Sequence, residues 1–233
     1  MLSVIIPLLD CNLIFLRCVL SFASVFDKDE VELVVVCPKK NVKIVSDYLA
    51  NINISIAHHV TSESSAGIYV AMNDGIRCSR GEYLTFFGQD DFIFPCYREF
   101  VEKIRLCSKD VKVFSCNIVM GGTDVEVSKY RKFKFFTGNY CHQALIYRKD
   151  VFQTEIFEPK YKIMADKVLN MSVIQRNNFL HFPKICAYFS TDGASSVEFD
   201  KVFHQDFPKL LSEKSSWILK LLIRFAVLMK GLR

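Results

Sequence analysis

The sequence lacks the cysteine spacing of a zinc-binding or disulfide-stabilised domain. It holds nine cysteines, an odd number, and no two of them are separated by only two residues. A CxxC pair is typical of structural zinc sites, and an even set in a short secreted chain is typical of a disulfide framework, so neither is predicted. Most of the cysteines lie in apolar runs, where a free thiol packs as a small hydrophobic group. We therefore expect a reducing compartment, the cytoplasm.

Signals for export, disorder and repeats are also missing. The N-terminus has no basic segment and meets Pro7 and Asp10 early, which is unlike a signal peptide. There are no repeats, low-complexity tracts or clear linkers, and the charged residues, 24% of the chain, are spread out. With 233 residues, the chain suits one domain, or one domain with an appendage.

Excess positive charge is confined to one end of the chain. Residues 214–233 contain five basic side chains and no acidic one, so the other 213 residues carry 30 − 5 = 25 basic and 25 acidic groups. A formally neutral body argues against a nucleic-acid-binding surface. We expect residues 1–205 to form the main domain and residues 206–233 to form a basic amphipathic helix.

The C-terminal tail is apolar but is interrupted by charge. Eleven of the thirteen residues from Trp217 to Met229 are apolar, whereas a membrane span needs about 20. Lys220 and Arg224 are four residues apart and share one helical face. The pattern favours a helix lying on an anionic membrane surface. The alternative is a helix packed on the domain or on a partner subunit.

The first half of the chain alternates apolar strands with helical stretches. The strands are continuously apolar, which predicts a parallel sheet covered on both faces by helices, an α/β fold. We expect the strands at "LSVIIP", "VELVVV", "ISIAHH" and "EYLTFF", and the helices at 12–26, 39–50 and 66–79, the last capped by Ser64 or Ser65 and stopped by Gly81. The second half is less regular, with helices at 96–108 and 165–177, a hairpin from "VKVFSCNIVM" and "TDVEV", and strands at "ALIYRK" and "ICAYFS".

Two adjacent acids follow the fourth predicted strand. In "GEYLTFFGQDDFIF" the apolar run ends at Gly88, and Asp90 and Asp91 come directly after it. They are either a solvated turn or a cation site. Because ligands of parallel sheets bind outside the carboxyl ends of the strands, the position favours a site. A Gly-rich turn after the first strand, GxxxxGK[ST] and GxSxG are all absent, which excludes dinucleotide-binding, P-loop and serine-hydrolase sites.

An ordered set of segments over roughly residues 2–196 resembles one family. The segments are "SVIIP", "GIYVAMNDGI", "GEYLTFFGQDD", "CHQALIYRKDVF", "KYKIMADKVL" and "AYFSTDGASS". Together they resemble family-2 glycosyltransferases of the GT-A fold, in the subgroup with a GIYDAMN-type helix. The resemblance implies a mostly parallel sheet flanked by helices, and transfer of a sugar with inversion from a nucleotide-sugar donor to a glycan or lipid-linked acceptor. It also implies a Mg²⁺ or Mn²⁺ cofactor. The implied process is the biosynthesis of lipopolysaccharide, capsule or another surface polysaccharide at the inner face of the plasma membrane.

The resemblance also implies roles for particular residues. Those roles are metal binding by Asp90 and Asp91, a catalytic base at Asp166, an acceptor side at His142 and Gln143, and a nucleotide-sugar side at Pro7, Gly67, Tyr69, Asn73 and Asp90. Structural roles remain as alternatives for three of these residues. Asp166 could stabilise a helix N-terminus. Asn73 could lie on a helix surface, and His142 could have a structural role. Asp192 and Gly193 resemble a loop that closes over the site.

Three departures from the family pattern matter for function. Gly88 stands where the first acid of the strand-end motif is usual, and Cys37 stands where an Asp usually reads the nucleobase. Val70 replaces the Asp of the GIYDAMN-type helix. The two acids missing at Cys37 and Val70 allow a second hypothesis, a non-catalytic homologue that binds a sugar nucleotide or a partner. A methyl- or nucleotidyltransferase is disfavoured because the first loop is not glycine-rich.

Overall fold

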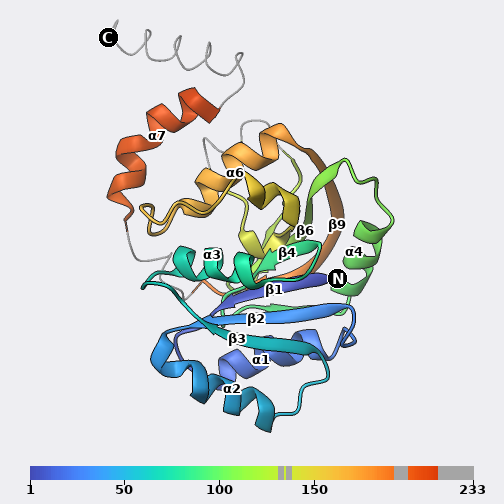
Figure 1. Ribbon diagram of the computed structural model, residues 1–233. Helices are drawn as coiled ribbons and strands as arrows, with labels where there is room; N and C mark the ends of the chain where they lie inside the picture. The colour runs from blue at the N-terminus through green and yellow to red at the C-terminus, as the bar shows by residue number, and fades with distance from the viewer. Residues whose placement is uncertain (131–133, 135–137, 192–198, 215–233) are drawn as a thin grey trace, which may run out of the picture.

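The computed structural model describes residues 1–130, 134, 138–191 and 199–214. Within them, nine strands form one mixed sheet in the order β3-β2-β1-β4-β8-β6-β9-β5, with β7 paired to β6 (Figure 1). The strands are β1 (Leu2–Pro7), β2 (Val31–Cys37), β3 (Ala57–Ser62), β4 (Tyr83–Phe86), β5 (Phe92–Ile93), β6 (Val111–Met120), β7 (Asp124–Glu126), β8 (Leu145–Arg148) and β9 (Asn178–Phe189). The helices are α1 (Leu13–Ala23), α2 (Val42–Asn51), α3 (Ile68–Cys78), α4 (Tyr97–Arg105), α6 (Ala165–Arg176) and α7 (Lys201–Lys214), with short 3₁₀ turns η1 (Lys39–Asn41), η2 (His142–Ala144) and η3 (Lys149–Gln153).

The first four strands form the parallel half that their apolar runs predict. β1 is flanked by β2 and β4 in parallel, and β2 pairs in parallel with β3. Figure 1 shows α1 and α2 on one face of this layer and α3 on the other. The carboxyl ends of β1 and β4 therefore open at the same edge, and the turn that carries Asp90 begins there.

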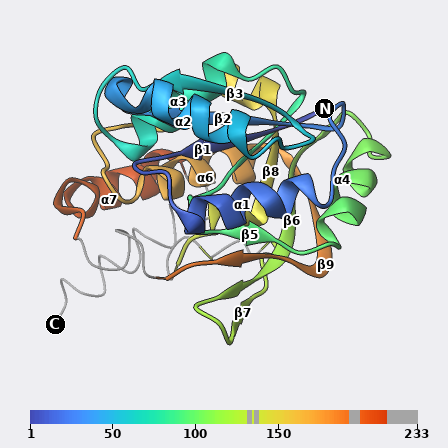
Figure 2. The same ribbon diagram turned by 90° about the horizontal axis from the view of Figure 1, so that it is seen from below.

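The second half makes the sheet mixed. β8 pairs antiparallel with both β4 and β6, β9 runs parallel to β6, and β5 pairs antiparallel with β9. The β6–β9 register shifts near Cys116 and Asn117, an irregularity that bends a sheet. The β6–β7 hairpin reverses at Gly121 and Gly122, both with positive φ, and projects from the body (Figure 2).

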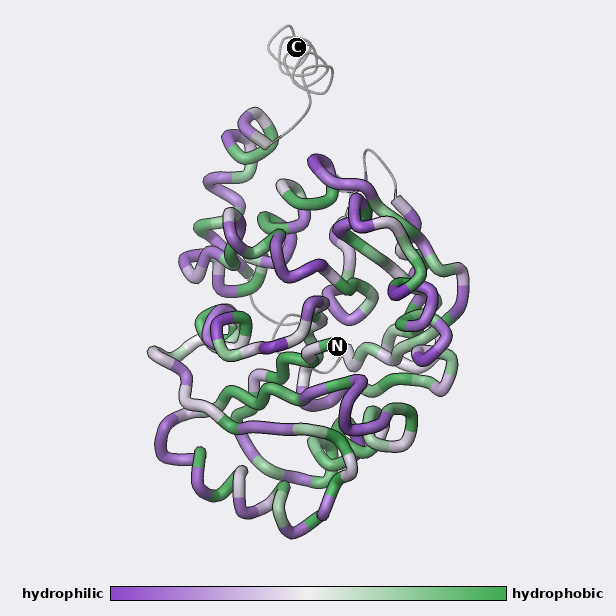
Figure 3. Tube along the Cα trace, turned by 45° about the vertical axis from the view of Figure 1, so that its right-hand side comes forward, coloured by the Kyte–Doolittle hydropathy of each residue, from purple (hydrophilic) through white to green (hydrophobic). Residues whose placement is uncertain are grey.

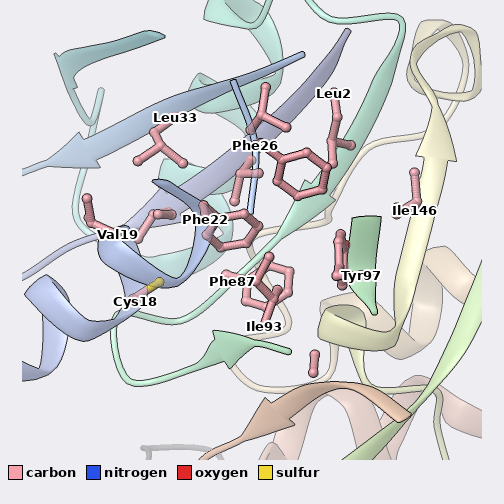
Figure 4. Packing of buried hydrophobic residues seen from close by; sticks show 14 of the residues in the cluster. Leu2, Cys18, Val19, Phe22, Phe26, Leu33, Phe87, Ile93, Tyr97 and Ile146 are labelled. Carbon is pink, nitrogen blue, oxygen red and sulfur yellow. The ribbon is translucent and has the colours of Figure 1, made fainter. Parts of the chain in front are cut away.

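Two apolar clusters fill the two faces of the sheet. Val4 and Ile6 of β1 belong to one cluster with α1, and Ile5 belongs to the other with α3, because successive side chains of a strand point to opposite faces. Figure 4 shows Phe22 of α1 packed edge-on against Phe87, with ring centroids 5.0 Å apart. The hydropathy trace in Figure 3 follows this plan, with hydrophobic central strands and helices that alternate between polar and apolar residues.

Some predicted boundaries were displaced. β3 begins at Ala57, three residues later than "ISIAHH" indicated, because Asn53 adopts a positive φ of 46° and residues 52–56 turn. His58 lies inside the strand, where it pairs with Leu33 of β2. The prediction of a serine cap on α3 was wrong, since Gly67 with φ 143° precedes the helix. The last strand is also longer than "ICAYFS" and starts at Asn178.

The helix α7 begins at Lys201 and runs across the predicted domain boundary at residue 205. It packs on α6, where the Lys167 ammonium lies 4.8 Å from the ring centroid of Phe207 and 5.5 Å from that of Phe203. The predicted tail beyond Lys214 and the loop at Asp192 and Gly193 lie outside the described residues. Among the helices that are described, none has the length and apolar content needed to cross a membrane.

Candidate active site

The turn after β4 is built around a buried Asp91. Its Oδ2 accepts hydrogen bonds from the Gly88 N–H at 2.7 Å and from the Gln143 side chain at 2.6 Å, and its Oδ1 accepts from the Ser190 N–H at 3.0 Å. The residue is 1% exposed. Burial raises the pKa of the Asp91 carboxyl to about 6, although the bonds from Ser190 and Gln143 oppose this rise. Asp91 thus ties the end of β4 to η2 and to the end of β9.

Asp90 presents a freer carboxylate beside this buried acid. Its backbone carbonyl accepts a hydrogen bond from Arg17 at 2.8 Å, while its carboxylate makes no hydrogen bond to the described residues. A Cβ atom at Gly88 would lie 2.7 Å from Asp90 Oδ1 and 2.9 Å from Asp91 Oδ2. The glycine that replaces the family's first acid therefore leaves room for both carboxylates.

These residues fit a divalent cation through one protein ligand. Among the described residues, no three His, Cys, Asp or Glu side chains gather into a complete cation site. Both Asp91 oxygens already accept hydrogen bonds inside the protein, which makes Asp90 the better candidate ligand. Mg²⁺ commonly takes one or two carboxylates and completes its shell with substrate phosphates and water.

Asp166 lies in the first turn of α6 and is held on both oxygens. Its Oδ2 accepts from the Asn139 side chain at 2.7 Å, and its Oδ1 lies 2.7 Å from the Lys167 N–H and 3.2 Å from the Tyr69 hydroxyl. The His142 ring Nδ1 stands 3.8 Å from Oδ2. The side chain of Asp166 does more than stabilise a helix N-terminus, because residues from α3 and from the segment before η2 converge on it.

The pair His142 and Gln143 connects the two acidic centres. Gln143 donates to Asp91, and its neighbour His142 faces Asp166. Gln143 is 1% exposed, and its side-chain oxygen has no hydrogen-bond partner within the part of the chain that the structure describes. The sequence placed these residues far apart, and the fold brings them into one continuous set.

Tyr69 and Asn73 serve the packing between α3 and the segment before α6. The Tyr69 hydroxyl donates to the Ile163 carbonyl at 2.6 Å, and its ring stacks on Phe157. The Asn73 amide exchanges two hydrogen bonds with the backbone of Phe157, at 2.8 and 3.1 Å. Both residues are buried. Their predicted contact with the nucleotide sugar stays a prediction, and the structure gives both a structural role.

Pro7 and Gly67 lie at the ends of elements in the parallel half. Pro7 ends β1, and just beyond it the Leu9 N–H donates to the Gln89 side chain at 3.3 Å, which joins this loop to the acidic turn. Gly67 is exposed in front of α3. Cys37, at the end of β2, is fully buried, with its thiol 3.9 Å from the Thr61 carbonyl. Burial raises the pKa of this thiol to about 11.

The sequence patterns missed two supporting residues. Asp200 is buried and accepts hydrogen bonds from the Ile163 and Met164 N–H groups at 2.9 and 3.2 Å, and from the Phe203 N–H at 3.0 Å. It therefore caps α7 and also holds the loop that leads into Asp166. An Asp just before a helical stretch was the available signal. Asn139 carried no such signal.

The comparison with protein families decides the assignment. Residues 3–176 match the model described as "Glycosyl transferase family 2". The chain belongs to this family. Relatives named "PGL/p-HBAD biosynthesis glycosyltransferase" from Mycobacterium bovis and Mycobacterium tuberculosis are 27% identical over 225 residues, which cover 89% of this chain and 84% of theirs.

Solved structures share the GT-A fold. S. aureus TarS in complex with UDP-GlcNAc superposes with a TM-score of 0.71 at 18% identity, covering 91% of this chain and 65% of that one. The mannosyltransferase PcManGT from Pyrobaculum calidifontis, in complex with GDP-Man and Mn²⁺, gives a TM-score of 0.62 at 13% identity, covering 91% and 62%. Against a longer TarS chain, this chain spans 38% of the length.

Proposed function

We propose that this family-2 protein is a metal-dependent, inverting glycosyltransferase that moves a sugar from a nucleotide donor to a lipid-linked or glycan acceptor. The observation that carries the proposal is the link between the acidic turn and Asp166 through Gln143 and His142. The Asp90 carboxylate is open to a cation, and the Asp166 carboxylate is held by neutral hydrogen-bond donors. Neighbours solved with UDP-GlcNAc, or with GDP-Man and Mn²⁺, add support.

On the donor side, Asp90 would hold Mg²⁺ or Mn²⁺ together with the diphosphate of the nucleotide sugar. When bound there, such a cation would neutralise the charge that develops on the leaving diphosphate. Asp91 keeps the turn in place through its three hydrogen bonds. Pro7 and Gly67 would border the nucleotide.

On the acceptor side, Asp166 acts as the general base, beside His142 and Gln143. The acceptor O–H bond breaks as its proton passes to the carboxylate, and the oxygen forms a bond to the anomeric carbon. The bond from that carbon to the phosphate oxygen breaks, and its electron pair leaves on the diphosphate. A single displacement of this kind inverts the configuration.

The predicted setting is the cytoplasmic face of the plasma membrane, in the synthesis of a surface polysaccharide such as lipopolysaccharide or capsule, or of a glycolipid. The relatives' names point to glycolipid synthesis, which suits a lipid-linked acceptor. The basic, apolar sequence of residues 206–233 would bring the enzyme to an anionic leaflet.

The proposal is tested by calorimetric titration with UDP-GlcNAc, UDP-glucose, GDP-mannose and dTDP-rhamnose, each with and without Mn²⁺. We expect at least one donor to bind with an affinity that depends on Mn²⁺, and Asp90→Asn to remove that dependence. The matched control is Asp10→Asn, which neutralises an exposed acid in the neighbouring β1–α1 loop and should leave the affinity unchanged.

Two outcomes would contradict the proposal. Unchanged Mn²⁺-dependent affinity in a folded Asp90→Asn protein would remove Asp90 from the cation site. Donor binding without nucleoside diphosphate release, in the presence of membrane glycolipid extracts, would favour the non-catalytic homologue. The buried Cys37 at the nucleobase position is the feature that motivates this alternative.

A further inference from the structure

A buried chain of side-chain hydrogen bonds leads from the protein core to Asp166. The Tyr147 hydroxyl of β8 donates to Asn170 Oδ1 at 2.6 Å, Asn170 Nδ2 donates to Asn139 Oδ1 at 3.2 Å, and Asn139 Nδ2 donates to Asp166 Oδ2 at 2.7 Å. Tyr147 is 1% exposed and Asn170 is 0% exposed. We call these three residues, Tyr147, Asn170 and Asn139, the amide relay.

The direction of the amide relay is dictated by a backbone group. Asn170 Nδ2 also lies 3.3 Å from the Tyr140 carbonyl oxygen, which can only accept. The amide nitrogen of Asn170 must therefore face Tyr140 and Asn139, and its oxygen faces the Tyr147 hydroxyl. Asn139 in turn must present its oxygen to Asn170 and its nitrogen to Asp166.

The amide relay leaves one oxygen of Asp166 available. Oδ1 accepts the Lys167 N–H, and the buried Tyr69 hydroxyl, whose single proton goes to the Ile163 carbonyl at 2.6 Å, packs 3.2 Å from the same oxygen. These two contacts hinder the approach of a further hydroxyl group to Oδ1. Oδ2 receives a single hydrogen bond, from Asn139, and the His142 ring stands beyond hydrogen-bond reach at 3.8 Å. The second lone pair of Oδ2 is therefore the one that a hydroxyl proton can reach.

We propose that Asn139, oriented by Asn170 and Tyr147, is a positioning residue that sets the Asp166 carboxylate so that Oδ2 receives the acceptor proton. This inference rests on the proposed function, because it assumes that Asp166 is the base. Neutral amides suit the task, since they orient a carboxylate without pairing it with a cation. A buried polar network of this kind keeps one arrangement only while every member is satisfied.

The cleanest perturbation is Tyr147→Phe, which removes one buried hydroxyl and leaves the ring in place. The matched control is Tyr97→Phe, which removes the same atom from a fully buried tyrosine in the other apolar cluster, where it contacts Thr85 at 3.4 Å. The first readout is the NMR signal of the Asn139 side-chain amide and the Asp166 carboxyl carbon in the labelled, ligand-free full chain. We expect both signals to shift in Tyr147→Phe and to stay in place in Tyr97→Phe.

The second readout is release of nucleoside diphosphate from the same four nucleotide sugars, with Mn²⁺ and a membrane glycolipid extract. We expect Tyr147→Phe and Asn139→Leu to lower turnover about tenfold, because small misplacements of a reacting group cost this much or more, while donor affinity stays unchanged. In an Asp166→Asn background, Tyr147→Phe should cause no further loss, since residues that act as a unit are not additive.

The two hypotheses fail in different ways. If the Asn139 and Asp166 signals do not move in Tyr147→Phe, the amide relay is refuted whatever the protein catalyses. If they move but Asp166→Asn keeps full turnover, the base assignment falls and the positioning role falls with it. An equal loss from Tyr147→Phe in the wild-type and Asp166→Asn backgrounds would show that Tyr147 acts through general stability and would overturn the inference.

Discussion

The buried Asp91 should make the protein less stable as the pH rises from 4 to 7. Its pKa is raised from 3.8 to about 6 in the folded protein, because burial disfavours the charged form. The folded state therefore binds this proton more tightly than the unfolded state does. The stabilisation is fully present below about pH 4 and is lost as the pH passes through 6.

The size of the loss follows from the shift in pKa. A rise of about 2 units corresponds to about 3 kcal/mol of unfolding free energy, at 1.36 kcal/mol per unit. About 2 kcal/mol of this should disappear between pH 4.5 and 7. The residue is almost fully buried, so solvent screening reduces this figure little.

Urea denaturation in the presence of EDTA measures the effect. We expect the difference in unfolding free energy between wild type and Asp91→Asn to fall by about 2 kcal/mol over that interval, since other titrating groups cancel. Asp90→Asn is the control and should retain most of the dependence, because the charge of Asp90 is a lesser cause of the raised pKa of Asp91. Parallel curves for wild type and Asp91→Asn from pH 4.5 to 7 would refute the reasoning.

Three further predictions follow from the same structure. Gly88→Ala should place a Cβ 2.7 Å from Asp90 Oδ1 and weaken Mn²⁺-dependent nucleotide binding; calorimetry that finds wild-type affinity would contradict this. The buried Cys37 offers no charged group to the nucleobase, so competition titrations with UDP, GDP and dTDP should give similar affinities, and a strong preference would count against the idea. Truncation after Lys214 keeps the whole of α7, and it should release the protein from anionic vesicles, where each basic side chain of the tail contributes about 1 kcal/mol. If the full chain fails to sediment with such vesicles at low salt, the membrane role is wrong.

The parallel half of the fold could be predicted because its signals are local. The runs "LSVIIP" and "VELVVV" are apolar at every position except Ser3 and Glu32, as expected of strands that are covered on both faces, and they form β1 and β2. The start of β3 could not be predicted in the same way. It depends on Asn53, whose left-handed conformation is permitted by the residue type but not demanded by it.

In the candidate site, too, some features could be predicted from local sequence and others could not. The position of Asp90 was predictable, since an acid after an apolar strand lies at the carboxyl end of a parallel sheet. Its neighbour was harder to assign, because two adjacent aspartates look alike in sequence and differ only in what surrounds them. Asp91 is enclosed by Gly88, Gln143 and Ser190, which lie up to 99 positions away in the chain, while the Asp90 carboxylate stays open.

The hydrogen bonds around Asp166 show why the acceptor side of the site could not be predicted fully from the sequence. Tyr69 reaches this carboxylate from α3, and Asn139 and His142 reach it from the segment around η2. Tyr69 and His142 lie in segments that the resemblance had singled out, whereas Asn139 belongs to no such pattern. Asn139 is an ordinary polar residue in sequence, and its side chain is oriented by Asn170, which in turn accepts a hydrogen bond from Tyr147 of β8. The position of a strand-end acid can thus be predicted from its own neighbours in the chain, whereas the hydrogen bonds that hold Asp166, the proposed base, follow only from the fold.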